Sequence, residues 1–158
     1  MVRAETIEVG APRDEVELEA YGHLATHAFS GNPPAAPEME WIHELGRENF
    51  LVARVDGQVV GYAIYFFTYS TFRARPTLYL EDIFVLPEQR GHGAGIALFR
   101  TCAREAVANE CARMEWQVLA WNEPSIAFYE RLGARHMADW LPFRLDDEAL
   151  LSVGTPRE

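Results

Sequence analysis

The sequence predicts an α/β fold in which one mixed sheet carries helices on both faces. Short segments rich in β-branched and aromatic residues alternate with segments whose apolar residues recur every three or four positions. The first pattern is typical of strands and the second of amphipathic helices. The expected order is strand, helix, helix, three strands, helix, strand, helix, strand, which corresponds to a layered α/β architecture. The chain has 158 residues and 49% are hydrophobic, so we expect a single domain over residues 1–158.

The first third of the chain predicts one strand and two helices. Residues 6–9 alternate in polarity, as a short strand does. Residues 14–29 place apolar side chains at helical spacing from Leu18 onwards, and the Pro-Pro pair that follows ends this helix. Residues 37–46 carry an apolar side and predict a second, short helix.

The middle of the chain predicts three consecutive strands. Residues 50–55 and 58–67 are two apolar runs separated by Asp56-Gly57, a strong signal for a two-residue hairpin. A polar loop that contains Arg73 and Arg75 follows, and residues 77–85 form the next strand.

The last third predicts alternating helices and strands. A helix is expected over residues 95–108 and a strand over 114–120. Asn122 can cap the next helix, Pro124 is tolerated in its first turn, and Gly133 ends it. Residues 138–145 predict a final strand or hairpin, and residues 146–151 a short tail helix.

Composition excludes several classes of function. The formal net charge of −10 argues against a nucleic-acid partner, because phosphate binding needs a basic face. It is compatible with a cationic substrate, although acidity also serves solubility alone. No apolar run approaches the ~18 residues of a membrane span, and the N-terminus lacks the apolar core of a signal peptide. The two cysteines, Cys102 and Cys111, read as reduced thiols of a cytoplasmic protein.

Two acidic residues and a glycine-rich turn stand out at the end of the strand over 77–85. Glu81 and Asp82 interrupt an apolar run. Buried carboxylates cost free energy unless they are paired or have a functional role. Alternation predicts that they face opposite ways unless a bulge intervenes. The turn from Arg90 to Gly95 matches neither a Walker loop nor a dinucleotide fingerprint. It suits an anion at the start of a helix, or it is simply a tight turn.

Arg90, Gly93 and Gly95 after a strand, followed by the segment from Asn122 to Gly133, resemble the GNAT superfamily of acetyl-CoA-dependent N-acetyltransferases. Residues 65–69, 78–82 and 121–125 resemble its spermidine/spermine (diamine) acetyltransferase branch more closely. The resemblance covers about residues 49–151. It implies a GNAT-like acyl-CoA acyltransferase fold, an α+β structure of three layers with a mostly antiparallel central sheet. It also implies acetyl-CoA as co-substrate, no metal, and a homodimer.

The resemblance also implies which residues contact the cofactor. The strand backbone is expected to hold the pantetheine arm, the glycine turn the pyrophosphate, and the start of the later helix a further part of the molecule. These residues are Ile83, Phe84 and Val85, then Arg90, Gly91, His92, Gly93, Ala94, Gly95 and Ile96, and finally Asn122 and Ser125.

Two catalytic residues are implied. Tyr129 matches the tyrosine that protonates the leaving thiolate, and a phenol of pKa ~10 remains protonated at neutral pH for that task. The alternative is a packed helix aromatic. Glu81 is the expected base, acting through water, because an amine of pKa ~10.4 must lose a proton before it attacks.

The acceptor is expected to contact Glu81, Asp82, His27 and Trp140. Asp82 is alternatively a structural hydrogen-bond acceptor, and Trp140 an ordinary packing residue. Polyamine-acetylating relatives carry an acid at the end of the first helix, which is absent here around His27. Arg73 and Arg75 repel a long polycation or bind the carboxylate of a lysine-like amino acid.

The sequence thus predicts an enzyme that transfers the acetyl group to a primary amine of a small molecule by direct attack. That amine belongs to a diamine, a polyamine or a lysine-like amino acid. The alternatives are a protein or peptide N-acetyltransferase of the same fold and a non-catalytic acyl-CoA-binding domain.

Overall fold

The computed structural model describes residues 6–28 and 49–155, with the backbone alone for residues 21–23 and 25–28. The chain divides into two compact units, Met1–Gln117 and Val118–Glu158. The Pro-Pro pair and the helix expected over residues 37–46 lie outside the described residues.

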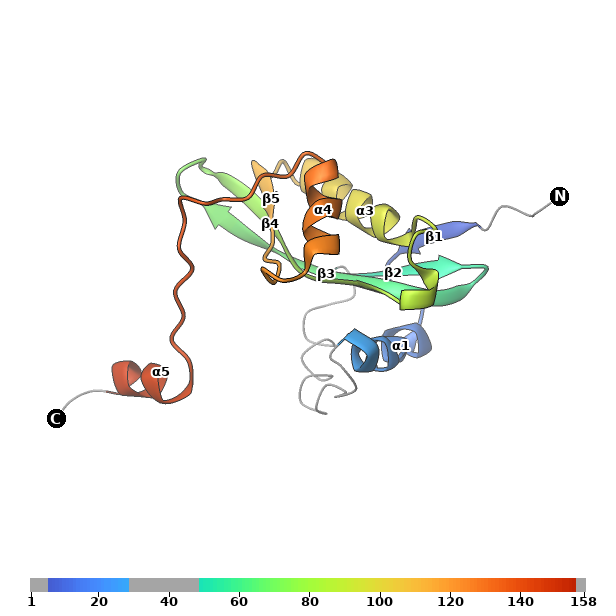
Figure 1. The fold of residues 1–158 in the computed structure, drawn as a ribbon, viewed down its shortest axis with the longest axis horizontal. Coiled ribbons are helices and arrows are strands. Elements are labelled where there is room, and N and C mark those ends of the chain that lie inside the picture. The colour runs from blue at the N-terminus through green and yellow to red at the C-terminus, as the bar shows by residue number, and fades with distance from the viewer. Residues whose placement is uncertain (1–5, 29–48, 156–158) are drawn as a thin grey trace. The chain divides into compact units, whose positions relative to one another are not determined.

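The first unit is built on a five-stranded sheet in the order β1-β2-β3-β4-β5 (Figure 1). Neighbouring strands from β1 to β4 are antiparallel, and β5 runs parallel to β4. The prediction of a mixed, mostly antiparallel sheet is therefore confirmed. The strands are β1 (Ile7–Gly10), β2 (Phe50–Val55), β3 (Gln58–Ser70), β4 (Arg75–Val85) and β5 (Arg113–Glu115).

Two hairpins join the central strands. Asp56 and Gly57 have φ values of 49° and 80°, so both residues of the turn are left-handed, as a type I′ hairpin requires. β3 and β4 are longer than expected, because Ser70 pairs with Arg75. Three of the seven residues of the polar loop expected over residues 70–76 are therefore strand, and residues 71–74 form the turn.

Helices α1 (Glu15–Ala28) and α3 (Ala94–Ala108) cover opposite faces of this sheet (Figure 1). The buried side of α3 includes Leu98, Phe99 and Cys102. A short 3-10 turn, η2 (Pro87–Gln89), links β4 to the glycine-rich turn before α3. Both helices were predicted from their apolar spacing, and their observed ends lie within one residue of the predicted ones.

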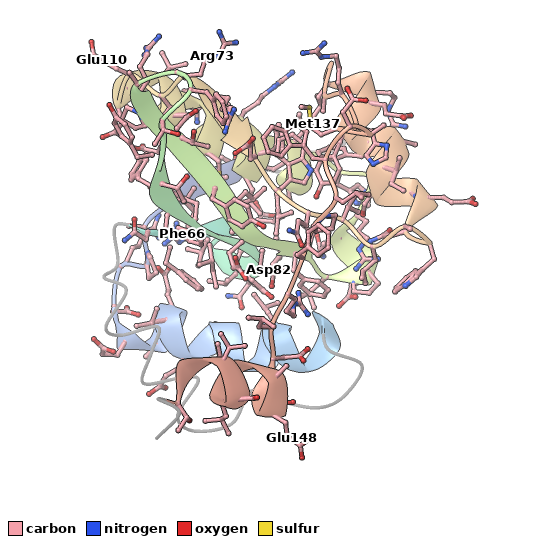
Figure 2. The ribbon with its side chains drawn as sticks, turned by 90° about the vertical axis from the view of Figure 1, so that its left-hand side faces the viewer. Phe66, Arg73, Asp82, Glu110, Met137 and Glu148 are labelled. Carbon is pink, nitrogen blue, oxygen red and sulfur yellow. The ribbon has the colours of Figure 1, made fainter. Side chains whose placement is uncertain are left out.

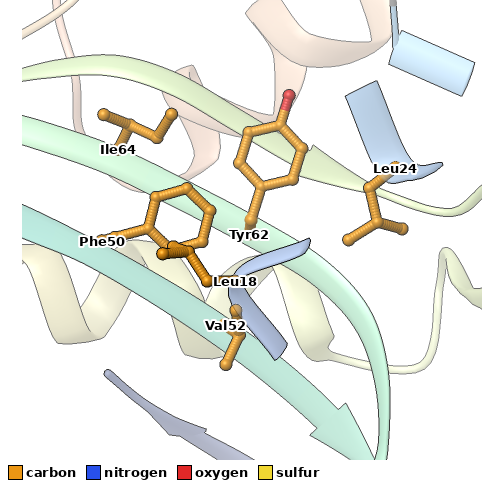
Figure 3. Close-up of a cluster of buried hydrophobic side chains, with 6 residues drawn as sticks. All are labelled: Leu18, Leu24, Phe50, Val52, Tyr62 and Ile64. Carbon is orange, nitrogen blue, oxygen red and sulfur yellow. The ribbon is translucent and has the colours of Figure 1, made fainter. Parts of the chain in front are cut away.

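A buried apolar cluster fills the space between α1 and the sheet (Figure 3). Two helix leucines meet aromatic and aliphatic side chains from β2 and β3 in this cluster. Its members are Leu18, Leu24, Phe50, Val52, Tyr62 and Ile64. Because each is at most 4% exposed, the cluster fixes the height of α1 above β3 and holds the backbone of β3 in place.

A buried ion pair fastens the start of α1 to β2. Arg54 is 2% exposed, and its Nε donates to Glu17 at 2.7 Å while a terminal nitrogen donates to the carbonyl of Ala11 at 3.0 Å. Glu17 lies in the first turn of the helix, where Asp14 accepts from its N–H at 2.9 Å. The guanidinium donors are thereby largely satisfied, which a buried charge requires.

The second unit contains helices α4 (Glu123–Arg131) and α5 (Asp147–Gly154). The side chain of Asn122 accepts from Ser125 N–H at 3.4 Å, and Gly133 has φ 87°. The predicted cap, the proline in the first turn and the terminating glycine of α4 are all confirmed. The tail helix is also present and extends to Gly154.

Two predicted strands differ from the structure. β5 ends at Glu115 rather than at residue 120, since its pairing with β4 stops at Tyr79. Residues 138–145 form no strand. Their apolar composition is strand-like, but a strand also needs a partner edge, and no strand of the described chain pairs with them. Pro142 additionally lacks an N–H to donate.

Candidate functional site

A β-bulge in β4 is the central irregularity of the sheet. Ile64 pairs with Asp82 and the next residue, Tyr65, pairs with Leu80, so Glu81 is left without a partner on β3. An extra residue of this kind bends the strand and redirects side chains. The bulge releases Glu81 and Asp82 from the strict alternation that would place them on opposite faces. Bulges are frequent beside active sites.

Glu81 projects from this bulge as an exposed side chain. Tyr79 lies two residues before it and pairs with Glu115 of β5. Burial raises the pKa of Tyr79, and the charges of Glu81 and Glu115 raise it further. Two carboxylates from adjacent strands therefore act on one phenol, and the Glu115 carboxylate is also ion-paired with Arg113 at 3.0 Å.

Asp82, which is labelled in Figure 2, is half-buried. The hydroxyl of Tyr62 donates to its Oδ2 at 2.5 Å. Burial raises the pKa of Asp82, while the hydrogen bonds from Tyr62 and from the N–H of Ile83 lower it, with burial the larger effect. Asp82 therefore accepts a hydrogen bond within the protein, as the alternative prediction of a structural acceptor requires.

The end of β4 has one edge that no described strand covers. β5 pairs with β4 only from Thr77 to Tyr79, so residues 80–85 are paired on the β3 side alone. On that side the strands are very close, because a Cβ placed on Gly61 would lie 2.6 Å from the carbonyl oxygen of Phe84. Alternate N–H and C=O groups of Ile83 to Val85 face the other edge, where an extended ligand can pair with them.

The glycine-rich turn leads directly into α3. Gly91 and Gly93 have φ values of 82° and 102°, a left-handed region that favours glycine. Gly93 is the N-cap of α3, it offers no side-chain cap, and the first turn carries no acidic residue. The first N–H groups of α3 are consequently left for another acceptor, and the helix dipole favours an anion there. His92 is exposed and Ala94 is buried.

Arg90 connects the turn to the end of β4. Its Nε donates to the carbonyl of Val85 at 2.9 Å, and its guanidinium carbon lies 5.5 Å from the ring centre of Phe84. This places a positive charge beside the uncapped start of α3, where it favours an anionic ligand.

The remaining predicted residues lie on α4, on the tail and on α1. Asn122 caps α4 through Ser125. Tyr129 is 9% exposed, and its ring lies 5.3 Å from that of Phe128. Trp140 is 64% exposed. His27 belongs to α1, but its side chain lies outside the described residues.

Sequence reasoning did not identify Tyr62 or Glu115 as part of the site. In the sequence, Tyr62 is one of several aromatic residues in an apolar strand. Only its pairing with the end of β4 brings its hydroxyl to Asp82. Glu115 read as an ordinary strand residue. The polar hydroxyl of Tyr62 inside an otherwise apolar strand is a signal that could have identified this residue, because a buried polar atom needs a partner.

In the part of the chain that the structure describes, no group of three or more His, Cys, Asp or Glu side chains is placed to hold a metal ion. None of the helices in residues 6–28 and 49–155 is long and apolar enough to cross a membrane.

Comparison with known proteins gives sequence relatives with named activities. Thialysine N-epsilon-acetyltransferase of Mus musculus is 40% identical over 95 residues, which cover 58% of this chain and 55% of that protein. L-ornithine N5-acetyltransferase of Arabidopsis thaliana is 36% identical over 113 residues, which cover 71% of this chain and 50% of that protein. The chain thus spans about half the length of the curated relatives it matches.

Solved structures share the fold. Aminoglycoside N-acetyltransferase AAC(6')-Iy in complex with CoA superposes with a TM-score of 0.77 at 21% identity, covering 92% of this chain and 98% of that one. A Vibrio cholerae integron cassette protein has a TM-score of 0.78 at 20% identity, covering 95% and 98%. At these identities the likeness concerns the fold.

The family assignment rests on the sequence model. The model of the acetyltransferase (GNAT) family matches residues 18–134, well over half of the chain. This range includes the bulge, the glycine-rich turn and α4. The chain belongs to the acetyltransferase (GNAT) family.

Proposed function

We propose that this protein is an N-acetyltransferase that moves the acetyl group of acetyl-CoA to a primary amine of a small molecule. The observation that carries the proposal is the bulge at Glu81. It places an exposed carboxylate at the start of an open strand edge that leads to an uncapped helix terminus. The family match over residues 18–134 spans parts of both units, which supports a single functional domain.

The residues of β4 and α3 fit acetyl-CoA as the donor. The open edge from Ile83 to Val85 can pair with the amide groups of the pantetheine arm. The N–H groups from Gly91 to Ile96, with Arg90 and His92 beside them, can accept the pyrophosphate. Asn122 and Ser125 are proposed to contact the donor through groups not used in their own capping bond.

The proposed reaction is a direct attack. The amine nitrogen forms a bond to the thioester carbonyl carbon while the bond from that carbon to sulfur breaks. Glu81, through a water molecule, takes the proton that the ammonium loses. The nitrogen loses its second proton to solvent as the amide forms. Tyr129 gives its phenolic proton to the departing thiolate and takes a proton back from solvent, so that the products are the amide, CoA with a free thiol and one released proton. A carboxylate and a phenol are groups that act as general base and general acid in such transfers.

Diamino acids are the favoured acceptor class. The two relatives are named for acetylation of the side-chain amine of thialysine and of ornithine. Each of these molecules also carries a carboxylate. Arg75 donates its Nε to the carbonyl of Glu110 at 2.9 Å. Arg73 lies in the turn before β4, roughly 20 Å along the strand from Glu81, so neither arginine is placed to bind that carboxylate while the amine lies at Glu81. Glu81, Asp82, His27 and Trp140 are proposed to contact the amine-bearing part.

A homodimer in the cytoplasm is the proposed working form. The tail exposes large apolar side chains, a pattern that marks an interaction surface. Their exposed fractions range from 53% to 92% for Met137, Trp140, Leu141, Phe143 and Leu145. The resemblance to the diamine branch favours a second copy of this chain as the partner that covers these side chains.

A panel of acceptors tests the proposal. CoA release is measured with acetyl-CoA and, in turn, ornithine, lysine, thialysine, putrescine, spermidine, an aminoglycoside and a peptide with a free N-terminus. We expect release to depend on the amine and to be fastest with the diamino acids. Preference for the peptide would replace the proposal by a protein N-acetyltransferase. Tight acetyl-CoA binding without release in any arm would indicate a non-catalytic domain.

A further inference from the structure

Tyr62 combines a closely packed aromatic ring with a buried hydroxyl. Tyr62 is 0% exposed, and its ring stacks on Phe50 at 6.0 Å with an interplanar angle of 10°. It also lies 5.9 Å from the ring of Phe84. A phenylalanine would fill the same volume and keep these ring contacts. What the tyrosine adds is one oxygen atom, which points out of the apolar cluster (Figure 3).

That oxygen donates to the carboxylate of Asp82 at 2.5 Å. The donor is rigid, because its ring is packed on both sides. Tyr62 faces Phe84 across the ladder, and Asp82 faces Ile64. The hydrogen bond therefore runs between neighbouring pairs of β3 and β4 and fixes the direction of the Asp82 carboxylate at the point where the bulge begins.

The bond leaves Asp82 able to bind a cation. A carboxylate has about four acceptor positions, and the described donors to Asp82 are the Tyr62 hydroxyl and the N–H of Ile83. Burial raises the pKa of Asp82 and outweighs the two hydrogen bonds, which lower it; the ammonium group of a bound acceptor would favour the charged carboxylate further. Among the described residues, no positive side chain is paired with this carboxylate in an ion pair.

We propose that Tyr62 is a positioning residue for the acceptor amine. Its hydroxyl holds the Asp82 carboxylate beside Glu81 in the orientation that binds the ammonium group of the acceptor. The inference rests on the proposed function, since it assigns a role in acceptor binding. It concerns specificity for the acceptor, and it leaves the binding of acetyl-CoA to other residues.

Tyr62→Phe removes this hydroxyl and keeps the aromatic packing. Loss of a hydrogen bond to a charged group weakens binding by about 10-fold or more. We therefore expect the KM for ornithine to rise about 10-fold, while kcat changes less than about 3-fold and the KM for acetyl-CoA stays the same. Tyr65→Phe is the matched control: Tyr65 is equally buried on the same strand, at 3% exposed, and pairs with Leu80 on the far side of the bulge.

A double-mutant cycle separates positioning from packing. Asp82→Asn keeps an acceptor for the Tyr62 hydroxyl but removes the charge, so its effect on the KM for ornithine should exceed that of Tyr62→Phe. In the Asp82→Asn background, Tyr62→Phe should add little, because it acts through the missing charge.

Several results would overturn the inference. Equal losses from Tyr62→Phe and Tyr65→Phe, additive effects in the cycle, or a lower melting temperature without a change in the KM for ornithine would each assign Tyr62 a structural role only. Those results leave the proposed function intact. A wild-type protein that releases no CoA with any amine would overturn the proposed function and this inference together.

Discussion

Arg90 donates its Nε–H to the backbone carbonyl of Val85 at 2.9 Å. The bond closes the short loop between the open edge of β4 and the first turn of α3. The same guanidinium lies over the ring of Phe84. Arg90 thus joins the two segments proposed to hold the two parts of acetyl-CoA.

Arg90→Gln should weaken acetyl-CoA binding. The change removes a positive charge beside the proposed pyrophosphate site and one bond that orders the loop. We expect the Kd for acetyl-CoA to rise about 10-fold, the size of one charge-assisted hydrogen bond, with no change in the KM for the amine. Isothermal titration with CoA measures it. Arg131→Gln, on α4, is the control, and an equal loss there would point to general electrostatics.

Gly61→Ala should disturb the end of β4. A Cβ at this position would lie 2.6 Å from the carbonyl oxygen of Phe84, and both atoms belong to rigid backbone. We expect the free energy of unfolding to fall by about 2 kcal/mol, as for other overpacked sites. Urea denaturation measures the change. Gly10→Ala has open space around its Cβ, and a comparable loss in that variant would remove the close approach as the cause.

Tyr129→Phe should slow the chemical step. If the phenol protonates the thiolate, kcat falls about 10- to 1000-fold, the range of general acid catalysis, and the KM for acetyl-CoA changes little. Steady-state CoA release measures both constants. Tyr69→Phe, which alters a tyrosine that is 63% exposed, is the control. If turnover is unchanged in Tyr129→Phe, Tyr129 has no role in the chemical step and serves only as a packed aromatic side chain of α4.

Glu81→Gln should lower kcat in a manner that depends on pH. Without a base the enzyme relies on the small fraction of amine that is already neutral, so kcat should fall about 100-fold at pH 7. The deficit should shrink as the pH rises toward the amine pKa of ~10.4. A pH–rate profile of both proteins tests this. Glu110→Gln serves as the surface control, and a deficit that is constant with pH would contradict the role.

Glu17 should stabilise the protein only above acidic pH. The Arg54 hydrogen bond lowers the pKa of Glu17 from 4.5 to about 2. Because the folded-state pKa is depressed, the stabilisation is fully present above pH 4.5 and is lost as the pH falls from 4.5 to about 2. Glu17→Gln should cost about 3 kcal/mol at pH 7, since it leaves Arg54 buried without its counter-charge.

The same variant should match the wild type near pH 2. Urea unfolding at pH 7, 4 and 2.5 measures the difference between the two proteins. Glu19→Gln alters an exposed carboxylate on the same helix and should show no such trend. A difference that does not vary with pH would exclude the ion pair as its source.

The local features of the fold followed from the sequence. Asp56-Gly57 formed the expected hairpin and Asn122 capped α4. The Gly91 and Gly93 turn adopted the conformation that only glycine takes easily. Each of these depends on a few consecutive residues, whose backbone angles and short hydrogen bonds are fixed by their own chemistry. The order of the first five strands along the chain came from patterns of the same kind, whereas the candidate donor site came from the resemblance to a known family.

The tertiary structure decided what depends on partners distant in the chain. The bulge that frees Glu81 from strand alternation arises from the register between β3 and β4. The hydroxyl of Tyr62 meets Asp82, twenty residues later, only through that register. The strand expected over residues 138–145 did not form, because strand formation needs a second edge as well as a suitable sequence. Sequence thus determined the family and predicted a donor site, whereas the proposed acceptor site depends on strand pairing that no local pattern encodes.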